Sequence, residues 1–237
     1  MIDLYGMGSP NVVRIYIALD ELALPYQVKP VDVFSGEQFS AEFRKLNPIS
    51  KVPVIVDHEG PGGKPYTVFE SAAILLYLAD KTGKLLPSDT AGKFDAIQWM
   101  IKAVTTLGPM SGQYAHFMRF APKQGNEYSL SRYKTQVHRV FEVAEERLGQ
   151  SPWIGGGEFS IADIAWFPWA RMLPTLLGAE DAGQYGKVAA WVEKIAARPA
   201  VAKALAATDE VRGRTTPFDK AKPEMLDKVF GRGQHAA

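Results

Sequence analysis

The chain has 237 residues, of which 46% are hydrophobic, so it is long enough to bury the core of one large domain or of two modest ones. Its 27 basic and 26 acidic residues nearly cancel, which leaves no charge surplus that would indicate nucleic-acid binding. It contains no cysteine, which excludes a protein disulfide, a zinc–thiolate centre and a cysteine nucleophile. Any thiol chemistry would therefore need sulfur from a small molecule.

Several classes of site and location are disfavoured by the sequence. No secretory leader follows Met1, and no apolar run reaches the ~18 residues of a membrane span, so we expect a cytoplasmic protein without a membrane partner. The four histidines are scattered and match no metal-binding spacing, so no metal is expected. The Gly6–Asn11 turn lacks the third glycine of a dinucleotide fingerprint, so no nucleotide cofactor is expected.

Short strand-like and helix-like stretches alternate over the first 85 residues. Strands are predicted at Ile2–Tyr5, Tyr26–Val31, Val52–Val56 and Tyr66–Phe69, with helices over residues 10–24, 39–46 and 71–81. Pro53 cannot donate to a sheet ladder, so its strand should lie at an edge or leave its proline-facing side free. The order β-α-β followed by β-β-α is that of a thioredoxin-like domain.

The rest of the chain has helical periodicity. Helical patterns run over residues 91–120 with a break at Gly108-Pro109, over 127–148, after the Ser160–Asp163 capping box, and over 188–197, with a short helix at 224–230. The predicted fold is α/β plus all-α. Its parts are a thioredoxin-like domain at 1–85, a linker at 86–90, a helical domain at 91–208 and a C-terminal extension at 209–237.

A set of local motifs stands in a specific order along this pattern. The motifs are Ser9-Pro10-Asn11, Lys51-Val52-Pro53, Phe69-Glu70-Ser71, Leu107-Gly108-Pro109-Met110, and Ser151–Gly156 before Ser160–Asp163. The set resembles the cytosolic glutathione S-transferase superfamily over roughly residues 1–205, and most closely its bacterial nu class. The resemblance implies the glutathione transferase fold, glutathione as co-substrate, a small-molecule second substrate and a homodimer.

The resemblance also assigns residues to glutathione. It implies a cis peptide bond before Pro53 that presents the backbone of Val52 to the cysteinyl unit. Ser71, at a helix N-terminus, would hold the γ-glutamyl carboxylate, and Glu70 would meet the ammonium group. Glu70 stands between an apolar strand and an apolar helix, where a buried glutamate would need a partner. Lys51 and Gln38 could bind the glycyl carboxylate, or could be ordinary surface residues.

Two residues at the start of the first helix would address the sulfur. Asn11 and Ser9 can donate hydrogen bonds to a thiolate, and the helix N-terminus lowers the pKa of a nearby thiol. Ser9 could equally be a plain N-cap. Tyr5 occupies the place where other classes carry a catalytic tyrosine, but in the nu class the equivalent residue is not assigned that role.

The second substrate is expected between the two domains. Aromatic and arginine residues that suit an anionic second glutathione follow the helix break: Gln113, Tyr114, Phe117, Arg119 and Arg132. Core packing of the aromatic residues and a solvated helix face for the arginines are the alternatives.

The activity favoured by the resemblance is glutathione-dependent disulfide reduction, and reduction of organic hydroperoxides by the same thiolate could accompany it. The lack of cysteine agrees with it, because both sulfurs would come from ligands. Conjugation of glutathione to electrophiles is the first alternative. A non-catalytic glutathione-binding or regulatory module is the second, because fold alone does not imply function.

Overall fold

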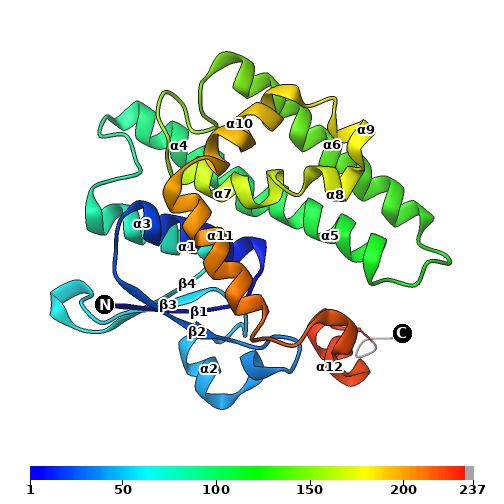
Figure 1. Ribbon diagram of the computed structural model, residues 1–237, viewed down its shortest axis with the longest axis horizontal. Helices are drawn as coiled ribbons and strands as arrows, with labels where there is room; N and C mark the ends of the chain where they lie inside the picture. Colours follow the sequence, from blue (N-terminus) through cyan, green and yellow to red (C-terminus); the bar gives the residue numbers. More distant parts are fainter. Residues whose placement is uncertain (233–237) are drawn as a thin grey trace. The chain divides into compact units, whose positions relative to one another are not determined.

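The computed structural model describes residues 1–232 and separates into two compact units. The thioredoxin-like unit comprises Met1–Leu78 and the segment that begins at Pro199, and the helical unit comprises Ala79–Arg198. The elements labelled in Figure 1 are, in chain order, β1 (Ile2–Gly6), α1 (Pro10–Glu21), β2 (Tyr26–Pro30), α2 (Ala41–Leu46), β3 (Val54–Asp57), β4 (Tyr66–Phe69), α3 (Ser71–Thr82), α4 (Thr90–Lys102), α5 (Gly108–Arg119), α6 (Glu127–Gln150), α7 (Ile161–Ala170), α8 (Leu173–Leu177), α9 (Ala179–Ala182), α10 (Gly186–Ala196), α11 (Pro199–Arg212) and α12 (Pro223–Phe230).

The thioredoxin-like unit is built on a four-stranded mixed sheet in the order β2-β1-β3-β4. Strand β1 pairs parallel with β2 and antiparallel with β3, and β3 pairs antiparallel with β4. Helices α1 and α3 lie on one face of the sheet and α2 lies on the other (Figure 1). The predicted element order and fold class are therefore confirmed.

The strand predicted to contain Pro53 lies inside the sheet and begins after the proline. Strand β3 is an interior strand, and its pairing starts at Val54, immediately after Pro53. The proline thus precedes the ladder, and its missing N–H removes no hydrogen bond from it. Val52, which was predicted within the strand, also lies outside it.

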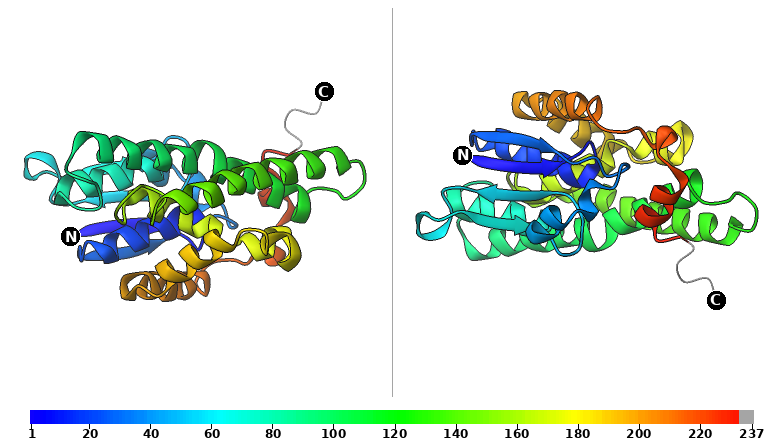
Figure 2. Two further views of the ribbon diagram at one scale, coloured as in Figure 1. Left: turned by 90° about the horizontal axis from the view of Figure 1, so that it is seen from above. Right: turned by 90° about the horizontal axis from the view of Figure 1, so that it is seen from below.

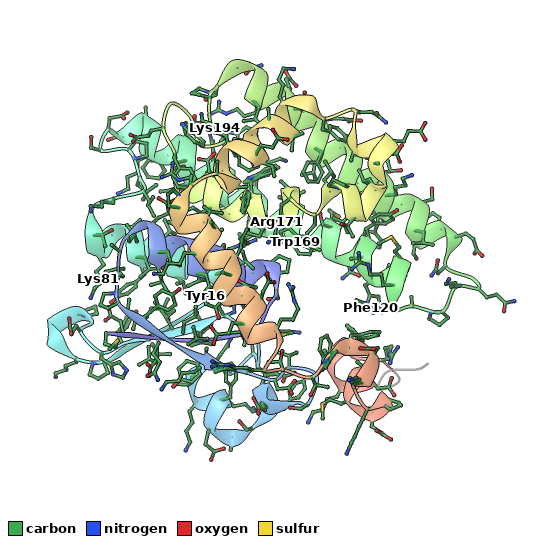
Figure 3. All side chains as sticks on the ribbon, viewed as in Figure 1. Tyr16, Lys81, Phe120, Trp169, Arg171 and Lys194 are labelled. Atoms are coloured by element: carbon green, nitrogen blue, oxygen red, sulfur yellow. The ribbon has the colours of Figure 1, made fainter. Side chains whose placement is uncertain are left out.

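Helix α1 is the most deeply buried helix of this unit. Its residues from Val12 to Leu19 are all buried, although only one face shows the predicted apolar spacing. Helix α1 is covered by the sheet and also by α11, which packs along it (Figure 1). Tyr16 of α1, labelled in Figure 3, lies beside α11, and its burial and the nearby Glu210 raise the pKa of its phenol. The sequence pattern did not indicate this helix, because Pro199 is compatible both with the end of the preceding helix and with the first position of a new one.

The helical unit contains a change of helical pitch where a break was predicted. Residues 103–107 form a π-helical turn between α4 and α5, so the chain stays helical through Gly108-Pro109. Proline cannot donate to the preceding turn and its ring crowds that turn, and a wider turn accommodates it. Helices α5 and α6 then lie side by side (Figure 2).

The predicted capping box at the start of α7 is confirmed. The Ser160 side chain accepts from the first turn, and the Asp163 side chain accepts from the Ser160 backbone. Asp163 also accepts from the backbone of Ile154 and from the indole of Trp191. The Ser160 hydroxyl also donates to Asp163 Oδ2 at 3.3 Å, so four donors converge on one fully buried carboxylate.

The domain boundaries set from the sequence remain predictions. The compact units divide at Leu78 and Pro199, so the segment 199–208, expected in the helical domain, groups with the thioredoxin-like unit. The last residues of the predicted extension, 233–237, lie outside the described residues. Within the described chain, no helix combines the length and the apolar character that a bilayer span requires.

Candidate functional site

The N-terminus of α1 presents two polar side chains next to the end of β1. Ser9 occupies the N-cap position with extended backbone, yet its hydroxyl makes no capping hydrogen bond. Asn11, in the first turn, is exposed. Gly6 allows the strand to approach this turn, because a Cβ there would overlap the Val12 side chain. The Ser9 hydroxyl and the Asn11 amide are thus both available as donors at a helix N-terminus.

The loop before β3 holds the backbone expected to pair with glutathione. The Val52–Pro53 peptide bond is cis, as the resemblance implied. The fully buried Asn47 fixes this loop: its Nδ2 donates to the Lys51 carbonyl at 2.8 Å, and its Oδ1 accepts from the Ile49 N–H at 3.0 Å. Because the sheet ladder starts at Val54, the main-chain groups of Val52 are outside it.

In the turn from β4 into α3, Glu70 is exposed and Ser71 is buried. Glu70 has left-handed backbone (φ +67°) and is exposed, so the expectation of a buried, paired glutamate is wrong. A non-glycine residue in this region of backbone conformation is uncommon and costs about 1 kcal/mol or more. Ser71 is buried at the first position of α3, and its Oγ accepts from Nη1 of Arg14 at 3.0 Å.

The two residues proposed for the glycyl carboxylate also differ in exposure. Lys51 is exposed beside Val52, in reach of solvent. Gln38 is buried, and its Nε2 donates to the carbonyl of Val33 in its own loop at 3.1 Å. Its amide therefore stabilises the loop between β2 and α2 in this structure, where the sequence suggested only a ligand contact or a solvated surface.

The C-terminal extension packs on this same loop. The backbone N–H and the hydroxyl of Thr216 donate to Asp32 Oδ2 at 3.0 and 2.6 Å. Phe218 stacks edge-on against Phe34 at 5.8 Å between ring centroids. Met225 of α12 sits over Gly36, where a Cβ would lie 2.6 Å from its sulfur. All three contacts are made within the thioredoxin-like unit, to which both the loop and the extension belong.

The residues predicted for the second substrate all lie on α5 and α6 of the helical unit. Gln113, Arg119 and Arg132 are exposed. Tyr114 is buried, and Phe117 stacks in parallel on Tyr133 with 5.5 Å between ring centroids. Packing within the helical unit, the alternative to a ligand contact, thus describes Tyr114 and Phe117 in this structure. Phe120, labelled in Figure 3, directly follows the end of α5. The three exposed polar residues remain candidates.

Sequence reasoning missed two residues of this region. Arg14 interrupts the apolar run of α1 and is only 1% exposed, a signal that was visible as a single cation among valines and isoleucines. Asn47 directly follows the predicted helix at 39–46 and precedes Pro48, and an asparagine at such a place can fold back on its own loop. Both residues stabilise positions that the resemblance assigns to glutathione.

The electrostatics of the region favour bound anions over protein nucleophiles. Burial, and secondarily the charge of Asp3, raises the pKa of Tyr5, so its phenol stays protonated at neutral pH. Burial lowers the pKa of the Arg14 guanidinium to about 10, which leaves it charged at neutral pH. Among the residues that the structure describes, no cluster of acidic and histidine side chains could hold a metal ion.

Comparisons with known proteins agree with this geometry. Family models named "Glutathione S-transferase, N-terminal domain" and "Glutathione S-transferase, C-terminal domain" match residues 8–81 and 107–199. The chain is 43% identical, over 86% of its length and 94% of the relative's, to the "Disulfide-bond oxidoreductase YfcG" of Escherichia coli. It also resembles YghU of that organism, another protein with the name disulfide-bond oxidoreductase, at 35% identity over 84% of this chain and 72% of the relative.

Solved structures show the same likeness. A glutathione transferase from Burkholderia graminis, solved with two glutathione molecules per subunit, is 41% identical with a TM-score of 0.82, covering 86% of this chain and 87% of that one. A glutathione transferase from Pseudomonas putida, solved with one glutathione disulfide per subunit, is 37% identical with a TM-score of 0.82, covering 86% and 90%.

Proposed function

Because the chain belongs to the glutathione S-transferase family, we propose that it reduces small-molecule disulfides with glutathione as the source of both thiols. The observation that supports this most directly is its 43% identity to a relative named disulfide-bond oxidoreductase, in a chain that has no cysteine. A protein without a thiol must take both reacting sulfurs from its ligands.

The reaction needs two thiol–disulfide exchanges. The thiolate of the first glutathione attacks one sulfur of the substrate disulfide, which forms a mixed disulfide and releases one thiolate. The second glutathione thiolate attacks the glutathionyl sulfur, which releases the second substrate thiolate and forms glutathione disulfide. Two glutathiones and one disulfide thus give one glutathione disulfide and two thiols. In a side reaction, the same thiolate would attack the terminal oxygen of an organic hydroperoxide, which breaks the O–O bond, releases the alcohol and leaves a glutathione sulfenic acid. The second glutathione would convert this sulfenic acid to glutathione disulfide and water.

The chain's own residues would activate the first thiol. Asn11 Nδ2 and the Ser9 hydroxyl donate to the thiolate at the N-terminus of α1, where the helix dipole favours negative charge. Lowering a thiol pKa by ~1.5–2 units corresponds to about 2–3 kcal/mol of preferential stabilisation of the thiolate. The backbone of Val52, outside the sheet ladder, would pair with the cysteinyl unit.

Other residues would bind the charged ends of the two glutathiones. Ser71 and Glu70 are proposed for the γ-glutamyl group of the first molecule, and Lys51 for its glycyl carboxylate. Gln38 would join Lys51 only if its amide left the Val33 carbonyl. Arg119 and Arg132 are proposed for the carboxylates of the second molecule, and the assembly is proposed to be a homodimer.

The test compares two reactions in one set of variants. Turnover of 2-hydroxyethyl disulfide with glutathione should exceed conjugation to chlorodinitrobenzene, and Asn11→Ala should lower it about 10- to 100-fold, as expected for a lost hydrogen bond to a charged group. Gln27→Ala, which removes an exposed amide on β2, is the matched control and should leave turnover unchanged. Strong conjugation with little disulfide turnover would refute the proposed reaction.

A further inference from the structure

A buried arginine lies directly behind the first turn of α3. Arg14 is 1% exposed, and its one hydrogen bond runs from Nη1 to Ser71 Oγ at 3.0 Å. Its Nε and Nη2 atoms are buried without a hydrogen-bond partner. A guanidinium carries five donors, so most of its hydrogen-bonding capacity is unused in this structure.

The surroundings of this cation make the arrangement unfavourable without a ligand. Among the described residues, no carboxylate lies within ion-pair distance of Arg14. The N-terminus of α3, to which its partner Ser71 belongs, adds partial positive charge of its own. A buried charge without a counter-charge strongly opposes folding. An apolar residue of similar size would pack in α1 at lower cost, so packing alone does not account for an arginine here.

An anion at the first turn of α3 would relieve both charges at once. Nη1 donates to Ser71 Oγ, which leaves the serine's own O–H free to donate toward an anion at the helix N-terminus. The arginine therefore both orients the hydroxyl and supplies a full positive charge behind it. We propose that Arg14 is a positioning residue for glutathione, whose buried guanidinium orients Ser71 and compensates the γ-glutamyl carboxylate.

This inference rests on the proposed function, because it takes glutathione as the ligand. It adds a residue that makes no direct contact with the ligand in the proposed arrangement. This residue acts behind the contact already proposed between Ser71 and the γ-glutamyl group, whose α-carboxylate carries the charge that Arg14 compensates.

The first experiment needs only the unmodified protein. Calorimetric titration would compare glutathione with γ-aminobutyryl-cysteinyl-glycine, which lacks that α-carboxylate and is otherwise the same peptide. Glutathione should bind about 10- to 100-fold more tightly, as expected for charge-assisted hydrogen bonds. Equal affinities would overturn the inference while leaving glutathione binding and disulfide reduction intact. No binding of either peptide would instead refute the proposed function.

The second experiment tests the arginine itself. Arg14→Met should reduce the ratio of the two affinities to within about threefold, mainly by weakening glutathione, while affinity for the truncated peptide stays within about twofold. Arg44→Met removes an exposed arginine from α2 and should keep the full ratio. Equal weakening of both peptides by Arg14→Met would show a general structural role and overturn the inference. If that variant does not fold, the Ser71→Ala variant, which removes the hydroxyl that Arg14 orients, should lose the ratio in the same way, and a retained ratio would overturn the inference.

Discussion

Thr216 fastens the C-terminal extension to the loop that contains Gln38, and the single change Thr216→Val should loosen that attachment. The substitution keeps the shape of the side chain and removes the 2.6 Å hydrogen bond from its hydroxyl to Asp32, while the 3.0 Å bond from its backbone remains. A hydrogen bond to a charged acceptor contributes about 1.5–3 kcal/mol, and the partial exposure of both residues places this one near or below the lower end, at about 1–1.5 kcal/mol.

The expected readout is local opening of α12, because the extension can detach while the sheet stays folded. A loss of about 1–1.5 kcal/mol corresponds to roughly 5- to 12-fold faster amide hydrogen exchange in the peptides that cover residues 213–230. Exchange in β1 and β3 should not change. Mass spectrometry of deuterium uptake resolves the two regions in one experiment.

The neighbouring threonine is the control. Thr215 is equally half-buried, but its hydroxyl donates only to the carbonyls of Val211 and Arg212 at the end of α11, at 3.4 Å. Thr215→Val should therefore leave exchange in α12 within about twofold of the wild type. Equal acceleration in both variants, or none in Thr216→Val, would refute the assignment of the attachment to the Asp32 contact.

Three further outcomes are expected. Gly36→Ala should destabilise the protein by about 1–3 kcal/mol, since Gly36 has φ +93° and lies under Met225, whereas Gly157→Ala, at an open position, should not change the melting temperature. Burial raises the pKa of Asp32, but hydrogen bonds from Thr216 and from the loop of Asp32 itself outweigh this effect and lower that pKa. The attachment of the extension should therefore be fully present above the ordinary aspartate pKa and should weaken as pH falls through the lower pKa of the folded state. Hydrogen exchange at a series of acidic pH values would detect this weakening. Ser9→Ala should lower disulfide turnover and leave the melting temperature nearly unchanged, because the hydroxyl caps nothing in the structure.

Local chemistry made much of the fold predictable. The capping box at Ser160 and the helix start at Ser71 depend on residues close in sequence, and both stand where the pattern placed them. The cis bond before Pro53 came from the family resemblance, which no composition or periodicity would have supplied. Strand pairing in the thioredoxin-like order followed from the alternation of elements.

Contacts between distant residues were not predictable in the same way. Glu70 is exposed and has left-handed backbone, and neither feature is indicated by the local sequence. Arg14 meets Ser71 across 57 positions, and Asp32 meets Thr216 across 184. Single-residue patterns do not encode such pairs, so the extension's docking place and the arginine behind α3 were missed.

Asp163 and Arg14 are both fully buried charges, yet their surroundings imply opposite roles and opposite responses to substitution. Asp163 Oδ1 accepts from Ile154 and Trp191, and Oδ2 accepts from Ser160, so an amide in its place would set N–H groups against donors whichever way it turned. Asp163→Asn should therefore destabilise the protein by about 2–4 kcal/mol, or roughly 4–16 °C in melting temperature for a chain of this size. Arg14→Met removes a charge that has no counter-charge, so without glutathione its melting temperature should equal or exceed that of the wild type. Thermal unfolding of both variants without ligand tests the contrast. A fall in melting temperature for Arg14→Met as large as that for Asp163→Asn would mean that the arginine, like the aspartate, serves the fold, and that its uncompensated charge is no sign of a bound anion.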